Sequence, residues 1–261
     1  MTNYIKSECY RIFHTKPIYL TALTLSGLTF LFNLVLWLFH RFDPEFRYAT
    51  TSFSYSNLVS QPMYYCIAAF AIAAILYEGE TRNGTQKNSI AYGISRTSLF
   101  LGKCLICLFS AFLTLIPVMA VYAGSAALLL PQQGPVTLQD LLMEIPAVSL
   151  VAVSAAVLGI FLLELFEQSI FGILVWYLIL FGIPKILFLL SIKLEFLQPA
   201  ALWLPANFFE DLAHPGMQVT TATCITVWDT GAGMAKCLTA GAMGILLFGL
   251  WAIVTLRNKD I

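Results

Sequence analysis

Charged residues are scarce in this sequence. Asp, Glu, Lys and Arg make up 11% of its 261 residues, whereas soluble chains carry roughly 25% charge. This shortage excludes an ordinary soluble domain. The 14 basic residues balance the 14 acidic ones, so the chain has no basic surface that would hold a nucleic-acid backbone. We therefore expect no nucleic-acid partner.

Motifs of catalysis and metal binding are also lacking. The sequence has no G-x-x-x-x-G-K-[ST] loop for phosphates, and the nearest imitation, Gly102-Lys103, continues into Cys104. No His, Ser or Cys arrangement indicates a hydrolase. Cys104 and Cys107 form a C-x-x-C pair inside an apolar run without a second Cys or His pair, which favours packing over metal ligation. We expect no catalytic residue, no metal and no cofactor on this chain.

Long apolar runs are what the sequence does contain. A helix that crosses about 30 Å of hydrocarbon needs about 20 apolar residues, and helices satisfy their backbone amides within lipid. We predict an all-α integral membrane protein with one transmembrane domain over residues 1–261. Its six predicted spans are residues 17–40, 62–77, 99–130, 146–166, 169–192 and 234–256.

Lys and Arg gather in alternate segments, which predicts the orientation. The positive-inside rule assigns such segments to the cytoplasm. They contain Lys6, Arg11, Lys16, Arg82, Lys87, Arg96, Lys103, Arg257 and Lys259. The opposite loops are acidic on balance and contain Asp43, Glu45, Asp140, Glu144, Glu195, Glu210, Asp211 and Asp229. We expect a multi-pass protein of the cell membrane with both termini in the cytoplasm.

The first sixteen residues form a short amphipathic pattern. Ile5, Cys9, Ile12 and Phe13 recur at helical spacing, as in a helix that lies in the membrane interface. The alternative is a simple positively charged flank of the first span.

The connection over residues 193–233 is predicted to be external. Its apolar stretch, residues 196–209, is interrupted by Pro199 and Pro205 and is too short to span. We predict a re-entrant helical hairpin, since irregular backbone at membrane depth must be surrounded by protein or a water-filled cavity. The alternative is an amphipathic loop over the helix ends. A Cys224–Cys237 bridge stays open.

Lys185 is the ionisable residue placed deepest in a predicted span. An ionisable group inside the membrane is by default a functional hypothesis. By helical rise Lys185 lies roughly 25 Å from the inner end of its span, near the outer boundary. Snorkelling of its ammonium toward water explains it better.

The segment over residues 78–98 is the longest predicted cytoplasmic connection. Gly84 and Gly93 mark the boundaries of a short helix. This helix runs over residues 85–92, from Thr85 to Tyr92, and offers Ile90 and Tyr92 to a partner. A short helix at the ends of two spans acts as a lever that passes movement from a soluble protein to the bundle.

The residues of this segment resemble a known pattern. It looks like the region after the second span in bacterial ABC-type exporter permeases of the six-helix, ABC-2-like superfamily. Lantibiotic, antimicrobial-peptide and drug export permeases belong there. The similarity covers the whole chain in architecture and about 25 residues in motif. The motif residues are Glu78, Glu80, Gly84-Thr85, Gly93-Ile94-Ser95-Arg96 and Lys103.

The resemblance implies that residues 85–92 form a coupling helix against a separate ATPase subunit, which would hold ATP and Mg²⁺. Glu78 and Glu80 would lie near its entry and Arg96 near its exit. It also implies a second permease subunit, identical or homologous. The alternative is a merely topogenic segment, which leaves the paired glutamates and the glycine spacing unexplained.

A second contact with the ATPase is predicted in the turn between the fourth and fifth spans. Glu164 and Glu167 lie there. The competing interpretation is a turn that is simply solvated.

The function predicted from these features is the permease half of an exporter for an amphipathic peptide, drug or lipid. One rival is a secondary transporter or channel, which should show inverted repeats or midplane ionisable groups. The other is a membrane-anchored sensor or assembly protein whose working part is the external Thr-rich loop.

Overall fold

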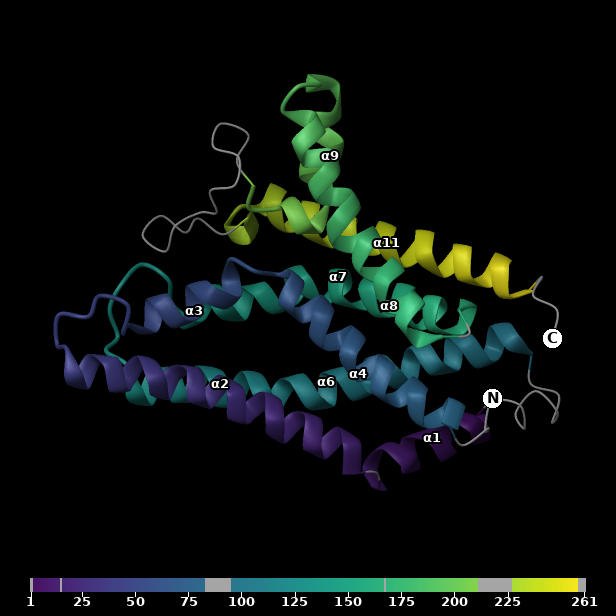
Figure 1. Ribbon diagram of the computed structural model, residues 1–261, viewed down its shortest axis with the longest axis horizontal. Coiled ribbons are helices and arrows are strands. Elements are labelled where there is room, and N and C mark those ends of the chain that lie inside the picture. Colours follow the sequence, from purple (N-terminus) through teal and green to yellow (C-terminus); the bar gives the residue numbers. More distant parts are fainter. Residues whose placement is uncertain (1, 15, 83–94, 167, 211–226, 258–261) are drawn as a thin grey trace.

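The computed structural model describes residues 2–14, 16–82, 95–166, 168–210 and 227–257, which form helices and the turns between them, with no strand among these residues. Five helices are long and apolar enough to cross a membrane, and a bent pair of shorter helices provides a sixth span if it is counted as one. The predicted all-α membrane class is confirmed. Figure 1 shows most of these helices running lengthwise, while α9 projects from the bundle.

The helices follow the predicted spans closely, with differences at two places. The bent pair begins earlier than the predicted second span, and α7 begins eight residues before the predicted start of the fourth. The principal helices are α1 (Thr2–His14), α2 (Lys16–Phe42), α3 (Thr51–Val59), α4 (Met63–Arg82), α6 (Arg96–Leu129), α7 (Leu138–Leu165), α8 (Ser169–Tyr177), α9 (Ile183–Ser191), α10 (Gln198–Trp203) and α11 (Gly231–Arg257). Short 3₁₀ turns are Glu195–Leu197, Pro205–Asn207 and Val227–Asp229.

Helix α7 is the central element of the bundle. Within its most apolar window 72% of the residues are buried, compared with 11% for α2 and 17% for α11. Small residues allow close approach of the helices. A Cβ on Gly159 would lie 2.2 Å from the Phe70 ring, and one on Gly241 of α11 would lie 2.5 Å from the Leu150 Cβ. Phe70 in turn stacks on Trp176 with ring centroids 4.3 Å apart.

Helix α3 is a polar helix that the sequence did not reveal. It meets α4 at a bend of 67°, after a break at residues 60–62. Its Ser54 Oγ donates to Asn33 Oδ1 of α2 at 2.7 Å. Asn33 Nδ2 donates to the Tyr122 carbonyl oxygen at 3.0 Å and to Ser125 Oγ at 2.8 Å, both in α6. Since Ser54 and Asn33 are fully buried, these bonds are what allow polar residues here.

The predicted fifth span consists of α8, a π-helical turn (Leu178–Gly182) and α9. The turn precedes Pro184, and its wider hydrogen bond runs from the Ile183 amide to the Leu178 carbonyl. A proline has no amide hydrogen and clashes with the preceding turn of a regular helix. A widened turn at this point is a common adjustment to such a conflict.

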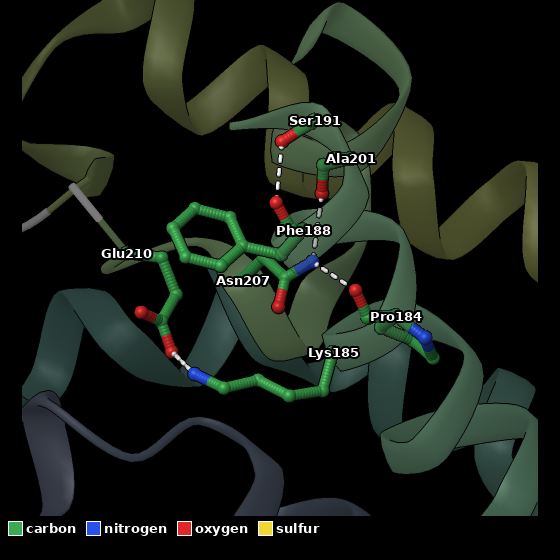
Figure 2. Close-up of polar contacts among 7 residues, drawn as sticks. All are labelled: Pro184, Lys185, Phe188, Ser191, Ala201, Asn207 and Glu210. Carbon is green, nitrogen blue, oxygen red and sulfur yellow. Dashed lines mark hydrogen bonds and ion pairs between the residues drawn. The ribbon is translucent and has the colours of Figure 1, made fainter. Parts of the chain in front are cut away.

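After α9 the chain folds back as a helical hairpin. Figure 2 shows the contacts that hold it: Asn207 Nδ2 donates to the carbonyl oxygens of Pro184 at 2.8 Å and Ala201 at 3.0 Å, and Lys185 Nζ lies 2.5 Å from Glu210 Oε1. Lys185 therefore has a carboxylate partner rather than water alone, although its side chain is 47% exposed. The re-entrant position of this hairpin in the membrane stays a prediction.

Candidate functional site

One end of the bundle collects the basic residues and is called the basic end below. It contains α1, the start of α6 and the last turn of α11, and lies at the right in Figure 1. Arg96 is the first residue of α6. Ser95 caps this helix, because its Oγ accepts a hydrogen bond from the Ser98 amide at 3.3 Å. The described part of the predicted coupling segment thus enters the membrane helix at a well-defined start.

The basic end contains a buried ion pair. Lys103 Nζ of α6 lies 2.8 Å from Glu164 Oε1 of α7, and the two side chains are only 3% and 6% exposed. The ammonium also lies 4.8 Å from the centre of the Tyr77 ring, on α4, in the range of a cation–π contact. Since an isolated buried charge is very unfavourable, these contacts hold α4, α6 and α7 together as one unit.

This cluster, called the Lys103 cluster, joins the two helices that flank the predicted coupling segment. The chain leaves the bundle along α4, just after Tyr77, and returns along α6, seven residues before Lys103. Glu164 then fixes both helices to α7, the central helix. The two helices that flank the connecting segment are thus in contact, through Lys103, with the central helix.

Helix α1 packs on the same end of the bundle. Ile12 is 1% exposed and belongs to the main core, and Phe13 meets Phe109 of α6 edge-on, with ring centroids 6.1 Å apart. Arg11 and Glu8 form an ion pair at 2.5 Å on another face of α1. The predicted apolar stripe thus exists, and at Ile12 it is covered by protein.

The predicted site residues divide by location. Glu78 and Glu80 lie on the last turns of α4, where side chains are outside the described part of the structure. Glu164 is turned into the bundle toward Lys103. The residues outside the described ranges are Gly84, Thr85, Ile90, Tyr92, Gly93 and Glu167. Their coupling roles, like those of Glu78, Glu80, Arg96 and Glu164, stay predictions.

A cavity of about 430 Å³ lies between α6 and α7, and residues of α4 also line it. Tyr65 of α4 lines it, and its hydroxyl donates to Glu144 Oε2 at 3.0 Å. The expectation that Glu144 belongs to an external acidic loop is wrong, because the residue lies in α7 and is fully buried. Sequence reasoning missed it because a carboxylate was taken as the sign of a loop.

The comparisons with known proteins agree with this architecture. A family model described as ABC-2 family transporter protein matches residues 4–185, from α1 into α9. No curated protein and no solved structure matched. The matched region covers more than half of the chain. It includes the first four spans, the segment that connects α4 to α6, and the fifth span as far as the start of α9. This chain therefore belongs to the ABC-2 family of transporter proteins, as a membrane permease of an ABC-type transporter.

Proposed function

We propose that the chain is the permease subunit of an ATP-driven exporter, with residues 85–92 as the coupling helix and both termini in the cytoplasm. Membership in the ABC-2 family supports an ATPase partner. Because the sequence has no phosphate-binding loop, ATP and Mg²⁺ belong to that partner. The cargo is an amphipathic peptide, drug or lipid that leaves the cell membrane or cytoplasm.

The Lys103 cluster is the observation that carries this proposal. Coupling requires that movement at a cytoplasmic segment change the arrangement of the membrane helices, and a flexible attachment would absorb such movement. The buried contact of Lys103 with Glu164 and Tyr77 instead connects both flanks of the segment to α7. This arrangement favours a lever over a purely topogenic loop.

A second permease subunit completes the proposed transporter. The span over α8 and α9 is strongly apolar, yet only 17% of its most apolar window is buried within this chain. Leu174, Tyr177 and Ile186 are each more than half exposed. The second permease, identical or homologous, is proposed from the resemblance, and the fifth span is one of three little-buried spans, with α2 and α11, that are exposed enough to receive it.

The test is whether the chain binds an ATPase and transports through it. The membrane-extracted protein should retain a nucleotide-hydrolysing subunit, and the reconstituted complex should move an amphipathic cargo only with ATP. Glu80→Arg and Gly84→Pro should each abolish ATP-driven transport. The matched control is Glu45→Arg, a reversal of an exposed carboxylate in the connection between α2 and α3.

Two results would overturn the proposal. One is a purified protein that never retains an ATPase. The other is unchanged transport in the Glu80 and Gly84 variants. Transport that persists without ATP would instead support a secondary transporter.

A further inference from the structure

The cavity between α6 and α7 is an apolar groove. It is lined by residues three or four apart on each helix, from Leu108 to Ala123 on α6 and from Leu138 to Val153 on α7. Two polar side chains reach its wall, and both already have partners. The Tyr65 hydroxyl donates to Glu144, and Ser149 Oγ donates to the Pro146 carbonyl oxygen at 3.1 Å. The groove therefore offers a ligand little beyond hydrocarbon contact.

The groove is open on its outer side. Ile116 is 65% exposed and Leu142 is 55% exposed, so its rim faces the bilayer in a membrane-spanning chain. The groove extends along α6 from Leu108 to Ala123, fifteen residues or roughly 22 Å of helix. A lipid chain extends across one leaflet of hydrocarbon, which is about 15 Å thick. The groove is therefore long enough for one extended lipid chain.

A polar cavity of about 370 Å³ adjoins the groove, and Leu138 lines both. Its wall carries the side chains of Thr51, Tyr55, Gln132, Gln133 and Thr137. These are hydroxyls and amides that donate and accept hydrogen bonds. No charged residue is among the described residues that line it.

The loop that forms this polar cavity is fixed in place. Ser52 Oγ accepts a hydrogen bond from the Val136 amide at 3.0 Å, and the Thr51 amide donates to the Pro131 carbonyl oxygen at 3.1 Å. Gly134 has a φ of 104°, and a Cβ there would lie 2.5 Å from the Ser52 Cβ. Only glycine fits this turn, so the cavity is a built feature of the fold.

We infer that this pair of cavities binds a neutral lipid of the bilayer, with one hydrocarbon chain in the groove and an uncharged, hydroxyl-bearing head in the polar cavity. No described residue that lines the polar cavity offers a positive charge to an anionic head. Two carboxylates lie nearby, and neither is offered to a cationic head: Asp140 Oδ2 already accepts from the Thr137 amide and hydroxyl at 2.7 and 2.8 Å, and Glu144 is fully covered behind Tyr65. If the bound lipid is also the cargo, the inference rests on the proposed function. The binding of the lipid itself does not require the ATPase.

Photolabelling of the chain in nanodiscs tests the inference. The probe is a monoacylglycerol with a diazirine in mid-chain, compared with the fatty acid and the trimethylammonium amphiphile of the same chain. We expect labelling of α6 and α7 peptides by the neutral probe, about tenfold stronger than by either charged probe. Equal labelling by all three probes indicates bulk lipid and overturns the site. A preference for the cation overturns the neutral head and points to Asp140, which contacts Thr137 of the cavity wall.

Variants test each half of the site. Ala120→Phe fills the groove from its exposed rim and should reduce labelling by about tenfold, whereas Leu105→Phe, on α6 but outside the groove, should leave it unchanged. Gln133→Glu adds a charge to the polar cavity and should lower labelling by the neutral probe. Gln168→Glu, an exposed residue before α8, is its matched control. Unchanged labelling in Ala120→Phe overturns the groove.

The labelling is measured on the permease alone, so its failure is separable from that of the exporter. A chain that binds the neutral probe but retains no ATPase contradicts the proposed function only. A chain that retains an ATPase and transports, yet shows no groove labelling, contradicts this inference only.

Discussion

Among the residues that the structure describes, two lysine–carboxylate pairs join neighbouring segments, and they differ in burial. Lys103 and Glu164 lie 2.8 Å apart with side chains 3% and 6% exposed, whereas Lys185 and Glu210 lie 2.5 Å apart with side chains 47% and 11% exposed. The shorter distance belongs to the more exposed pair. Distance alone therefore says little about what each pair contributes.

The difference in solvent access predicts different roles. Breaking a buried pair is strongly destabilising, so separation of the helices at the basic end costs a large free energy. Water replaces a lost partner at an exposed pair. We therefore expect the ion pair at the hairpin after α9 to break more easily than the pair at the basic end.

The largest effect is expected from Glu164→Leu. It leaves the Lys103 ammonium buried without its carboxylate, which should lower the free energy of unfolding by about 3–5 kcal/mol. Tryptophan fluorescence during unfolding in mixed micelles measures the loss. The double variant Lys103→Met with Glu164→Leu should recover most of the stability, because no charge is then left. A double variant as unstable as the single one contradicts the comparison.

A smaller effect is expected from Asn207→Leu, which releases the hairpin without removing an ion pair. Two hydrogen bonds, to the Pro184 and Ala201 carbonyl oxygens, are lost. The expected cost is about 1–2 kcal/mol. Amide hydrogen exchange should accelerate in α10 and leave α7 unchanged. Gln198→Leu is the control on the same hairpin, since its bond to the Ser191 carbonyl oxygen is long at 3.4 Å. Protection of α10 that survives in Asn207→Leu would show that apolar packing alone holds the hairpin.

The smallest effect is expected from Glu210→Gln. This change leaves Lys185, whose side chain is 47% exposed, to water, so the loss should be less than about 1 kcal/mol, and the pair should weaken further in high salt. The same unfolding measurement, with Glu195→Gln as a control at the exposed turn after α9, checks the value. A loss as large as that of Glu164→Leu would remove the distinction between the two pairs.

The sequence predicted the helices whose apolar runs are long enough to span. It did not predict α3, because the segment TSFSYSNLV looks polar and its burial depends on partners in α2 and α6. Nor did it predict the first eight residues of α7. Asp140 belongs to a helix start, where its Oδ2 accepts from the Thr137 amide at 2.7 Å, and Glu144 pairs with Tyr65. The Thr137–Asp140 cap is local and was readable as a helix start, whereas the partner of Glu144 lies 79 residues away in the chain.

The candidate site shows the same limit. Lys103 fitted the positive-inside pattern, which accounts for a basic residue without any partner. Its carboxylate partner lies 61 residues further along the chain. A lysine within an apolar helix and a glutamate at the end of another were the available signals. Only the packing of α6 on α7 turns them into a pair.

The π-helical turn at Leu178–Gly182 uses five residues where a regular helix closes its hydrogen bond with four. One added residue rotates everything that follows by about 100° around the helix axis. The faces of α8 and α9 are therefore out of phase, although they belong to one span. This rotation aims the Pro184 carbonyl and Lys185 at Asn207 and Glu210. The docking register of the hairpin is thus set inside the preceding span, by a single extra residue.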